Sequence, residues 1–366
     1  MPQKTIVFTG FPGFLGTELL PRVLARAEDA TAACLIQSQH APLARTRVAE
    51  LTAAEPALEG RIELVEGDIT LPDLGLGDRY EQLAATTSEV FHLAAVYDLA
   101  VPREIARKVN VTGTAHVLDF AQAAPGLERV QYVSTCYVSG RYPGPFRETD
   151  LSKGQRFNNH YEETKHAAEV VVQERMADGL PATIYRPAVV SGDSATGATQ
   201  KLDGPYFVLR WILRQPKQVA VMPMAGDPAS YRFNFVPRDF VVDAIAELSA
   251  RKDTNDTVYA LADPDPLTVS ELLDLFRELT DKRLIVVPLT TGLAKGAIAH
   301  VPGVERLMQI PPEAVDYFTH PTHYLTDHTT AALADTDIRL PDKREWCQRL
   351  VAFTRENLAM TSAAMV

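Results

Sequence analysis

The stretch Thr9-Gly10-Phe11-Pro12-Gly13-Phe14-Leu15-Gly16 decides the fold predicted for this chain. It follows a short β-rich run, Thr5–Thr9, and opens an amphipathic segment, Leu15–Ala27. A glycine-rich turn between a strand and a helix lets the backbone approach a pyrophosphate, which the free N–H groups of the helix N-terminus can bind. We predict that the whole turn binds a dinucleotide. Its spacing is GxxGxxG, and an ordinary tight turn is the alternative.

Beyond this turn, β-rich runs alternate with helical patterns, which indicates a parallel sheet covered by helices on both faces. The predicted strands are Thr5–Thr9, Ala32–Gln37, Ile62–Glu66, Glu89–Leu93, Arg129–Ser134 and Ala182–Tyr185. The predicted helices are Leu15–Ala27, Pro42–Ala54, Pro102–Ala123 and Asn159–Ala177. We therefore predict an α/β fold with a doubly wound, Rossmann-type sheet of about six or seven strands. It occupies residues 1–190 and is completed by part of residues 230–262.

The regular alternation fails after about Gly192. Residues 192–230 are rich in Gly, Pro, Ser and Asp around one apolar segment, Tyr206–Leu213. Further helical patterns are Val241–Ala250, Val269–Leu279, Ala331–Asp335 and Lys343–Asn357. We expect residues 191–366 to form mainly a smaller substrate-binding lobe.

Composition excludes several classes of protein. The net charge of −11 over 366 residues disfavours nucleic acid and anionic membranes as partners. No apolar run is long enough to predict a transmembrane segment. The three scattered cysteines, Cys34, Cys136 and Cys347, fit neither a disulfide framework nor a metal motif, so we predict a cytoplasmic location and no metal. A homodimer is compatible with the sequence.

The end of the second predicted strand bears on the choice between NAD and NADP. A carboxylate there would bind the ribose 2′-hydroxyl and repel a 2′-phosphate. The stretch from Leu35 to His40 has no acid, and Gln37 stands where the ribose is expected. Arg45 and Arg47 follow, and a guanidinium can bind a phosphate bidentately. NADP(H) is therefore favoured over NAD(H), although both arginines could belong to a solvated helix face.

Two further strand ends are predicted to contact the cofactor. Gly67-Asp68-Ile69 follows the third strand, where Asp68 is placed to meet the adenine. His92-Leu93-Ala94-Ala95 ends the fourth, and its small residues would let the backbone pack against the cofactor. A turn aspartate and a buried strand end are the respective alternatives.

The segment from Tyr161 to Lys165 places a tyrosine and a lysine one helical turn apart, and Thr135 lies 26 residues before Tyr161. Hydride transfer to a carbonyl leaves negative charge on its oxygen, so a site for it needs hydrogen-bond donors and a proton source. Tyr161 can be that acid if Lys165 lowers its pKa, with Thr135 as second donor. Asn110 interrupts an apolar helix and needs buried partners. We expect it to support Lys165 through water, or else to make a purely structural bond.

With these residues the chain resembles the extended short-chain dehydrogenase/reductases over nearly its whole length. The matching motifs are Thr9-Gly10-x-x-Gly13-x-x-Gly16, Gly67-Asp68-Ile69, His92-Leu93-Ala94-Ala95, Asn110-Val111-x-Gly113-Thr114, Val133-Ser134-Thr135, Tyr161-x-x-x-Lys165 and Arg186-Pro187. The resemblance implies a Rossmann domain with a smaller C-terminal substrate domain. It also implies a catalytic centre of Thr135, Tyr161 and Lys165, supported by Asn110. The residues implied to run past the nicotinamide are Tyr185, Pro187, Ala188, Val189 and Val190.

Four stretches are more similar to the thioester-reductase and fatty-acyl-reductase branch than to sugar-nucleotide epimerases. They are Gly10–Gly16, Val133–Tyr137, Tyr161–Glu169 and Asn234–Val241. This branch implies NADPH-dependent reduction of an acyl thioester, on coenzyme A or a carrier protein, to an aldehyde and sometimes onward to an alcohol. One departure is that many relatives carry arginine where this chain has Gln37.

Other interpretations stay open. A nucleotide-sugar epimerase or a hydroxysteroid or alcohol dehydrogenase would share the motifs, and a dinucleotide-sensing regulator would need no catalytic set. Cys136 could capture a thioester, although hydride can attack the thioester directly. His320-x-x-His323 with Asp327-His328 is similar to a set of metal ligands, but we expect a surface loop there.

Overall fold

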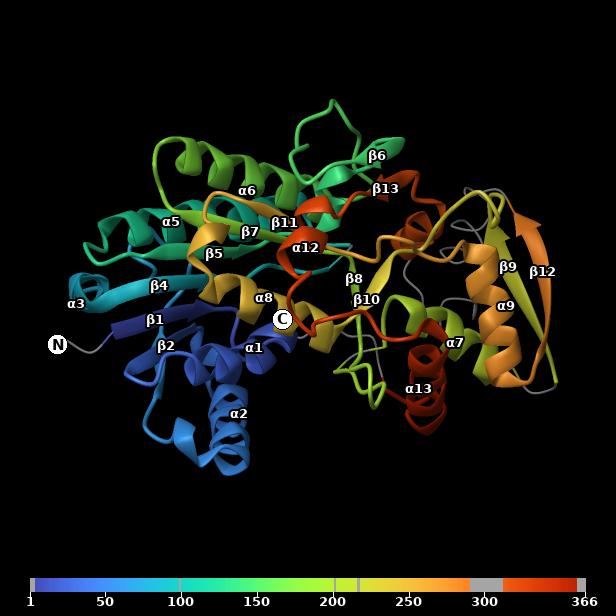
Figure 1. The fold of residues 1–366 in the computed structure, drawn as a ribbon, viewed down its shortest axis with the longest axis horizontal. Coiled ribbons are helices and arrows are strands. Elements are labelled where there is room, and N and C mark those ends of the chain that lie inside the picture. Colours follow the sequence, from blue (N-terminus) through green and yellow to red (C-terminus); the bar gives the residue numbers. More distant parts are fainter. Residues whose placement is uncertain (1–3, 99, 201, 216–217, 290–311, 361–366) are drawn as a thin grey trace.

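The computed structural model of the chain describes residues 4–98, 100–200, 202–215, 218–289 and 312–360 (Figure 1). Its centre is a parallel sheet of seven strands. In sheet order the strands are β11 (Val258–Leu261), β7 (Ala182–Pro187), β5 (Arg129–Val133), β4 (Thr87–His92), β1 (Lys4–Thr9), β2 (Ala30–Ile36) and β3 (Ile62–Glu66). The chain leaves β1 toward β2 and returns to pair β4 with the other side of β1, so the strand order reverses between β1 and β4. A crevice for ligands forms at such a point.

Helices cover both faces of this sheet (Figure 1). One face carries α1 (Phe14–Ala25), α2 (Ala41–Ala54) and α8 (Arg238–Ala250). The other carries α3 (Arg79–Thr86), α5 (Thr114–Ala123) and α6 (His160–Ala177). Each layer closes its own core, because the strands are apolar on both sides. The predicted fold class is confirmed.

The predicted helix Pro102–Ala123 is the main irregular element of this domain. It begins as α4 (Arg103–Ala106), widens into a π-helical segment, η3 (Arg107–Gly113), and continues as α5. Asn110 lies within the widened segment. Such π segments often lie at functional sites. Helix α3 has no counterpart among the predicted helices.

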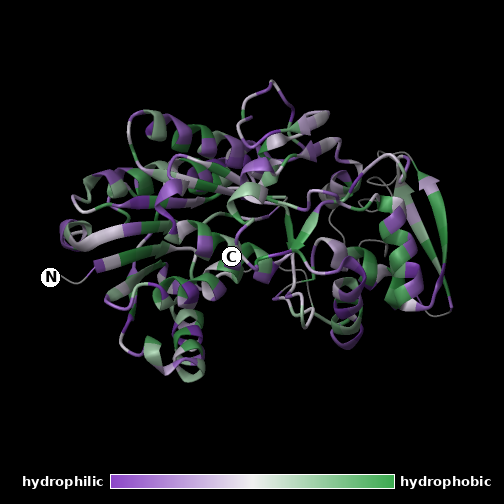
Figure 2. Ribbon diagram, viewed as in Figure 1, coloured by the Kyte–Doolittle hydropathy of each residue, from purple (hydrophilic) through white to green (hydrophobic). Residues whose placement is uncertain are grey.

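A third core lies beside the sheet (Figures 1 and 2). It packs α7 (Pro205–Arg214), α9 (Val269–Thr280) and α13 (Lys343–Glu356) together, whereas α12 (Asp327–Ala332) packs near β11. Short parallel ladders pair β6 (Gly144–Phe146) with β13 (Thr322–Tyr324), β8 (Val189–Ser191) with β10 (Phe235–Pro237) and β9 (Val219–Ala225) with β12 (Arg283–Leu289). Phe146 of β6 and Tyr324 of β13 belong to the core on the α1 face of the sheet. Short helical turns are η1 (Ser38–His40), η2 (Pro56–Leu58), η4 (Cys136–Ser139), η5 (Lys252–Thr254) and η6 (Pro312–Thr319).

Two predictions for this part of the chain are wrong in detail. The helix expected over Ala331–Asp335 lies at Asp327–Ala332. The segment expected to be a surface loop contains β13, and His320 beside it is only 5% exposed. His320 Nε2 lies 2.7 Å from the Tyr324 hydroxyl, so burial with a hydrogen-bond partner explains this histidine. Among the helices described, none has the length and apolar character needed to cross a bilayer.

Candidate active site

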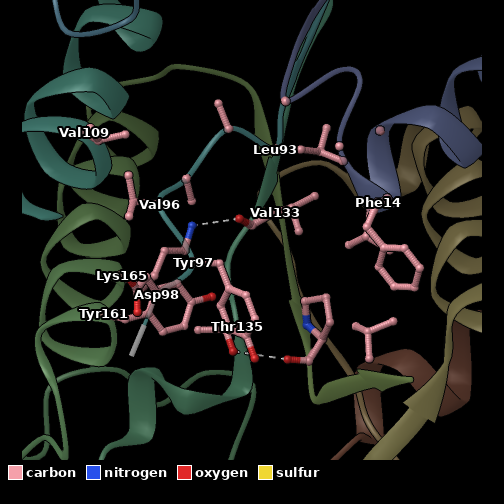
Figure 3. A pocket seen from close by; sticks show the side chains of 18 of the residues that line it. Phe14, Leu93, Val96, Tyr97, Asp98, Val109, Val133, Thr135, Tyr161 and Lys165 are labelled. Atoms are coloured by element: carbon pink, nitrogen blue, oxygen red, sulfur yellow. Dashed lines mark hydrogen bonds between the residues drawn. The ribbon is translucent and has the colours of Figure 1, made fainter. Parts of the chain in front are cut away.

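A cavity of about 640 Å³ opens at the carboxyl ends of the central strands, where the strand order reverses. Most residues predicted to contact the cofactor or substrate line it. They are Gly10, Phe11, Pro12, Gly13, Phe14, Leu15, Gly16, Gln37, Asp68, Ile69, Leu93, Ala94, Ala95, Thr135, Tyr161, Lys165, Pro187, Ala188, Val189 and Val190. Figure 3 shows Thr135, Tyr161 and Lys165 close together, with Phe14 on the far side of the cavity.

The glycine turn is shaped for close backbone approach. Gly10 has a φ of +93°, and a Cβ there would lie 2.8 Å from the Ala94 backbone nitrogen. At Gly13, which begins α1, a Cβ would lie 2.6 Å from the Gly10 carbonyl oxygen. At Gly16 the same oxygen would be 2.7 Å away. Side chains are therefore excluded, and the open N-terminus of α1 faces the cavity, as binding of a dinucleotide pyrophosphate requires.

The second and third strands end at a polar corner of the cavity. The Asp68 carboxylate accepts a hydrogen bond from the Thr70 backbone N–H at 2.8 Å. Burial acts to raise the pKa of Asp68, but hydrogen bonds from Thr70 and Gln37 prevail and hold this pKa below its ordinary value. Asp68 is therefore a carboxylate at neutral pH, able to accept from an adenine amino group or a ribose hydroxyl.

The two arginines predicted for this corner lie elsewhere. Arg45 is exposed on α2 and does not line the cavity. Arg47 pairs with Glu50 at 2.6 Å. His40 does line the cavity, and our sequence analysis gave it no role. Its position at the end of η1, three residues after Gln37, was the available signal.

The residues predicted to form the reactive centre come from α6 and from the loop that follows β5. Tyr161 is hydrogen-bonded with the Thr135 hydroxyl and is only 8% exposed. The Thr135 hydroxyl also donates to the Pro187 carbonyl at 3.4 Å. Burial raises the pKa of Tyr161 well above its ordinary value, and the hydrogen bond with Thr135 only partly offsets this. At neutral pH the phenol keeps its proton, which suits a proton donor.

Lys165 is held by the strand on which it packs. Its ammonium nitrogen donates to the Tyr132 hydroxyl at 2.9 Å. It also donates to the Val133 carbonyl at 2.9 Å (Figure 3). Burial lowers the pKa of Lys165 to about 7, while the charge of Glu169 acts in the opposite direction. We expected Lys165 to lower the pKa of Tyr161, but burial raises this pKa, and the group that opposes the rise is Thr135.

Asn110 and Tyr185 do not line the cavity. The Asn110 side chain accepts from the Val96 backbone N–H at 2.9 Å and donates to the Thr164 hydroxyl at 3.1 Å. It thus ties the loop after β4 to α6, which is the structural alternative stated above. The Tyr185 hydroxyl donates to Gln131 at 2.8 Å inside the sheet, because alternate residues of a strand face opposite sides.

A buried ionic network lies directly behind the reactive centre. Arg186 on β7 donates to Glu169 on α6 through Nε at 3.0 Å, and Ser134 donates to the same carboxylate. The side chains of Arg186 and Glu169 are 2% and 0% exposed. This Ser134–Glu169–Arg186 network fixes β5, α6 and β7 to one another, immediately beside Thr135.

Cys136 belongs to this buried layer rather than to the cavity wall. Its thiol lies 3.0 Å from the Arg186 carbonyl oxygen and is 2% exposed. Burial raises the pKa of the thiol. A buried, protonated thiol is a poor nucleophile, so the structure does not favour a role for Cys136 in capturing a thioester.

The wall beyond Tyr161 is aromatic. Tyr97 meets the Tyr161 ring edge to face, with ring centroids 5.1 Å apart. Tyr137 meets Tyr317 in the same way at 4.5 Å. Further aromatic residues of this wall are Phe207, Phe233 and Phe318. Sequence reasoning did not find this wall because its members come from five separate segments of the chain.

Comparison with known proteins assigns this chain to a family. Residues 8–245 match the model of the Male sterility protein family, an NAD-binding family. A component of the linear gramicidin synthase of Brevibacillus parabrevis is 31% identical over 282 residues, which are 74% of this chain and 5% of that protein. Glycine betaine reductase ATRR of Emericella nidulans is 30% identical over 292 residues, which are 75% of this chain and 22% of that protein. The chain therefore spans less than a quarter of either curated relative.

A solved structure agrees with this assignment. The terminal R domain from the myxalamid PKS-NRPS biosynthetic pathway superposes with a TM-score of 0.82 at 27% identity. The match covers 100% of this chain and 93% of that one. The predicted resemblance is confirmed. This chain belongs to the Male sterility protein family and is an NAD(P)-dependent oxidoreductase of the extended short-chain dehydrogenase/reductase type.

Proposed function

We propose that the protein is an NADPH-dependent reductase of an acyl thioester, carried on coenzyme A or a carrier protein, or of the derived aldehyde. One observation carries the proposal. The hydrogen-bonded Tyr161–Thr135 pair stands in the cavity between a dinucleotide-shaped glycine turn and an aromatic wall. This arrangement offers a carbonyl oxygen two donors and its acyl group an apolar surface.

The relatives support a thioester as the substrate. Matching regions lie in a gramicidin synthase and in a glycine betaine reductase, and the similar R domain is the terminal domain of a PKS-NRPS pathway. We propose that an acyl group, delivered as a thioester, enters this cavity, and that the protein works in the reducing cytoplasm, where its three free cysteines are stable.

The proposed mechanism assigns a role to each residue of the reactive centre. A bound reduced nicotinamide supplies the hydride. Tyr161 donates its proton to the carbonyl oxygen, and the Thr135 hydroxyl donates a second hydrogen bond as charge develops there. Lys165 orients this end of α6 through its bonds to β5, and its charge stabilises the tyrosinate. Asn110 acts as a positioning residue, because it holds the loop after β4 against α6.

Two features support NADPH rather than NADH. No carboxylate stands at the end of β2, where Gln37 lines the cavity beside Asp68. His40 lines the same corner, and a ring N–H there can donate to a 2′-phosphate. Comparative binding titrations of NADPH and NADH test this point, and tighter binding of NADH would overturn it.

Two alternatives are less well supported. A nucleotide sugar carries a diphosphate, which proteins commonly bind with arginine. Among the described residues that line the cavity, there is no arginine, and Lys165 is bonded to β5. A dinucleotide sensor would not need the Thr135, Tyr161 and Lys165 set.

The direct test is the variant Tyr161→Phe, assayed with a panel of acyl-CoA thioesters, aldehydes and nucleotide sugars. Loss of the proton donor should lower turnover by roughly 10²- to 10⁴-fold, while the Kd for NADPH should change little. Turnover that survives the substitution would contradict the mechanism. Activity of the wild-type protein on nucleotide sugars alone would contradict the proposed substrate class.

A further inference from the structure

Glu162 is a buried acid beside the reactive tyrosine that the mechanism above does not use. It follows Tyr161 on α6, and its side chain is fully buried. One carboxylate oxygen accepts from the Asn158 backbone N–H at 2.9 Å, and the Asn158 amide donates to the other at 3.0 Å. A buried carboxyl group needs such partners.

Tyr317 connects this acid to the cavity. Its hydroxyl is hydrogen-bonded to Glu162, and the Asn159 amide donates to the same hydroxyl at 3.3 Å. Tyr317 lines the cavity, and its ring packs edge to face on Tyr137, another wall residue. A short path therefore runs from the Glu162 carboxyl through the Tyr317 hydroxyl to the aromatic wall.

The surroundings of Glu162 favour its protonated form near neutral pH. Burial raises the pKa of Glu162 to about 7, hydrogen bonds from Asn158 and Tyr317 oppose this rise, and the nearby Asp316 adds to it. The titratable or charged groups facing this region are Tyr161, Asp316, Tyr317, Tyr137, Tyr324 and, through Asn158, Arg141. Glu162 can therefore hold a proton near neutral pH, where an ordinary glutamate is ionised.

Thioester reduction consumes one proton overall. Tyr161 is not the net source of this proton, because it regains the proton that it gives. In the first step a C–H bond forms with hydride from the reduced nicotinamide, and the carbonyl oxygen takes the Tyr161 proton. When the carbonyl re-forms, the C–S bond breaks and that oxygen returns its proton to Tyr161. The single proton consumed overall therefore ends on sulfur, since an ordinary thiol has a pKa near 8.5 and is protonated at neutral pH.

We propose that Tyr317 and Glu162 form a second acid that protonates the departing thiol. Tyr317 gives its proton to the sulfur as the C–S bond breaks, and Glu162 gives its own proton to Tyr317. After the thiol leaves, a proton from solvent reaches the Tyr317–Glu162 pair through the open cavity and restores the acid. This inference rests on the proposed function, because reduction of an aldehyde has no thiol to expel.

The test compares two substrates in each of two variants, Tyr317→Phe and Glu162→Gln. An acyl-CoA and the aldehyde of the same acyl group are reduced with NADPH. We expect the ratio of thioester turnover to aldehyde turnover to fall roughly tenfold or more in both variants, as befits loss of a general acid. An unchanged Kd for NADPH in the same sample shows that the variant is folded.

Tyr324→Phe is the matched control. It removes a buried hydroxyl from the same aromatic cluster, but Tyr324 does not line the large cavity. Its ratio should match that of the wild-type protein. Equal loss of both activities in Tyr317→Phe and Glu162→Gln would indicate a structural role and overturn the inference, as would an unchanged ratio. A wild-type protein that reduces aldehydes but not thioesters would also overturn the inference, whereas one that reduces neither substrate would refute the proposed function.

Two further measurements separate proton donation from packing. A thioester of an acidic aromatic thiol, which leaves readily as thiolate, should restore turnover to Tyr317→Phe. No rescue would count against the inference. Independently of activity, infrared titration of the protein without cofactor should show a protonated carboxyl band near pH 7 that Glu162→Gln lacks. An identical band in that variant would show that Glu162 is not the proton store.

Discussion

The two halves of the cavity are built by different means. The dinucleotide half is shaped by backbone, since Gly10, Gly13 and Gly16 leave no room for a Cβ atom around one carbonyl oxygen and the end of β4. The substrate half is shaped by side chains such as Tyr137 and Phe207, which come from separate elements. A wall made of backbone suits a ligand that stays the same, the dinucleotide. A wall made of side chains can be altered by single substitutions to suit different substrates.

The comparison predicts different responses to mutation. A change in the backbone half should affect every substrate alike, because it disturbs the shared cofactor. A change in the aromatic half should affect some acyl groups and leave dinucleotide binding intact. The buried Ser134–Glu169–Arg186 network lies behind the reactive centre where the halves meet, so damage there should affect both.

The largest effect is therefore expected from Glu169→Gln. It leaves the Arg186 guanidinium buried without its counter-charge, and removing one partner of a buried pair commonly lowers the free energy of unfolding by about 3–5 kcal/mol. Denaturant unfolding measures this change. Arg175→Ala, which breaks the exposed pair with Asp119, is the control and should lower it by less than about 1 kcal/mol. Equal effects would show that the network does not hold the two halves together.

A smaller effect is expected from Gly13→Ala. The new Cβ would lie 2.6 Å from the Gly10 carbonyl oxygen, so the turn must shift. Overpacking of this kind commonly destabilises a structure by about 1–3 kcal/mol. We therefore expect Gly13→Ala to bind the dinucleotide more weakly in titrations. Gly126→Ala is the control, because its Cβ would meet only the Thr87 carbonyl oxygen, at an ordinary 3.5 Å. Unchanged dinucleotide affinity in Gly13→Ala would mean that the backbone does not shape this half.

The smallest effect is expected from Phe207→Leu in the aromatic half. Leucine keeps much of the apolar contact, so kcat/KM for bulky acyl substrates should fall only roughly fivefold. This change corresponds to about 1 kcal/mol of lost transition-state stabilisation. The Kd for NADPH should stay the same. Trp211→Phe, one turn further along α7 and outside the cavity wall, controls for general effects on this helix. A weaker NADPH complex in Phe207→Leu would erase the distinction between the halves.

The glycine-turn residues predicted for the dinucleotide half line the cavity, and the information that places them is local. Gly13 and Gly16 are required by steric contacts within their own turn, and β1 and α1 follow from periodicity on either side. The proximity of Tyr161 and Lys165 could also be predicted from the sequence, since one helical turn brings the two residues to one face. These features are determined by neighbours in the chain.

The errors concern residues whose partners are distant in sequence. Arg45 lies outside the cavity wall, while His40 lies on it. This difference depends on the direction in which the chain leaves η1 to form α2. Tyr185 was expected beside the nicotinamide but faces Gln131 on the neighbouring strand. His320 was expected at the surface but is buried against Tyr324.

The sequence by itself determined the Rossmann sheet, the glycine turn and the Thr135, Tyr161 and Lys165 set, because turns, strands and helices impose short-range rules on residue type. Only the tertiary structure decided which side chains form the aromatic wall and which acid lies behind it. Tyr317 is 155 residues from Glu162, as their numbers show, and their hydrogen bond exists only because η6 packs against the start of α6. Contacts of that separation follow from packing of the whole chain and leave no local pattern.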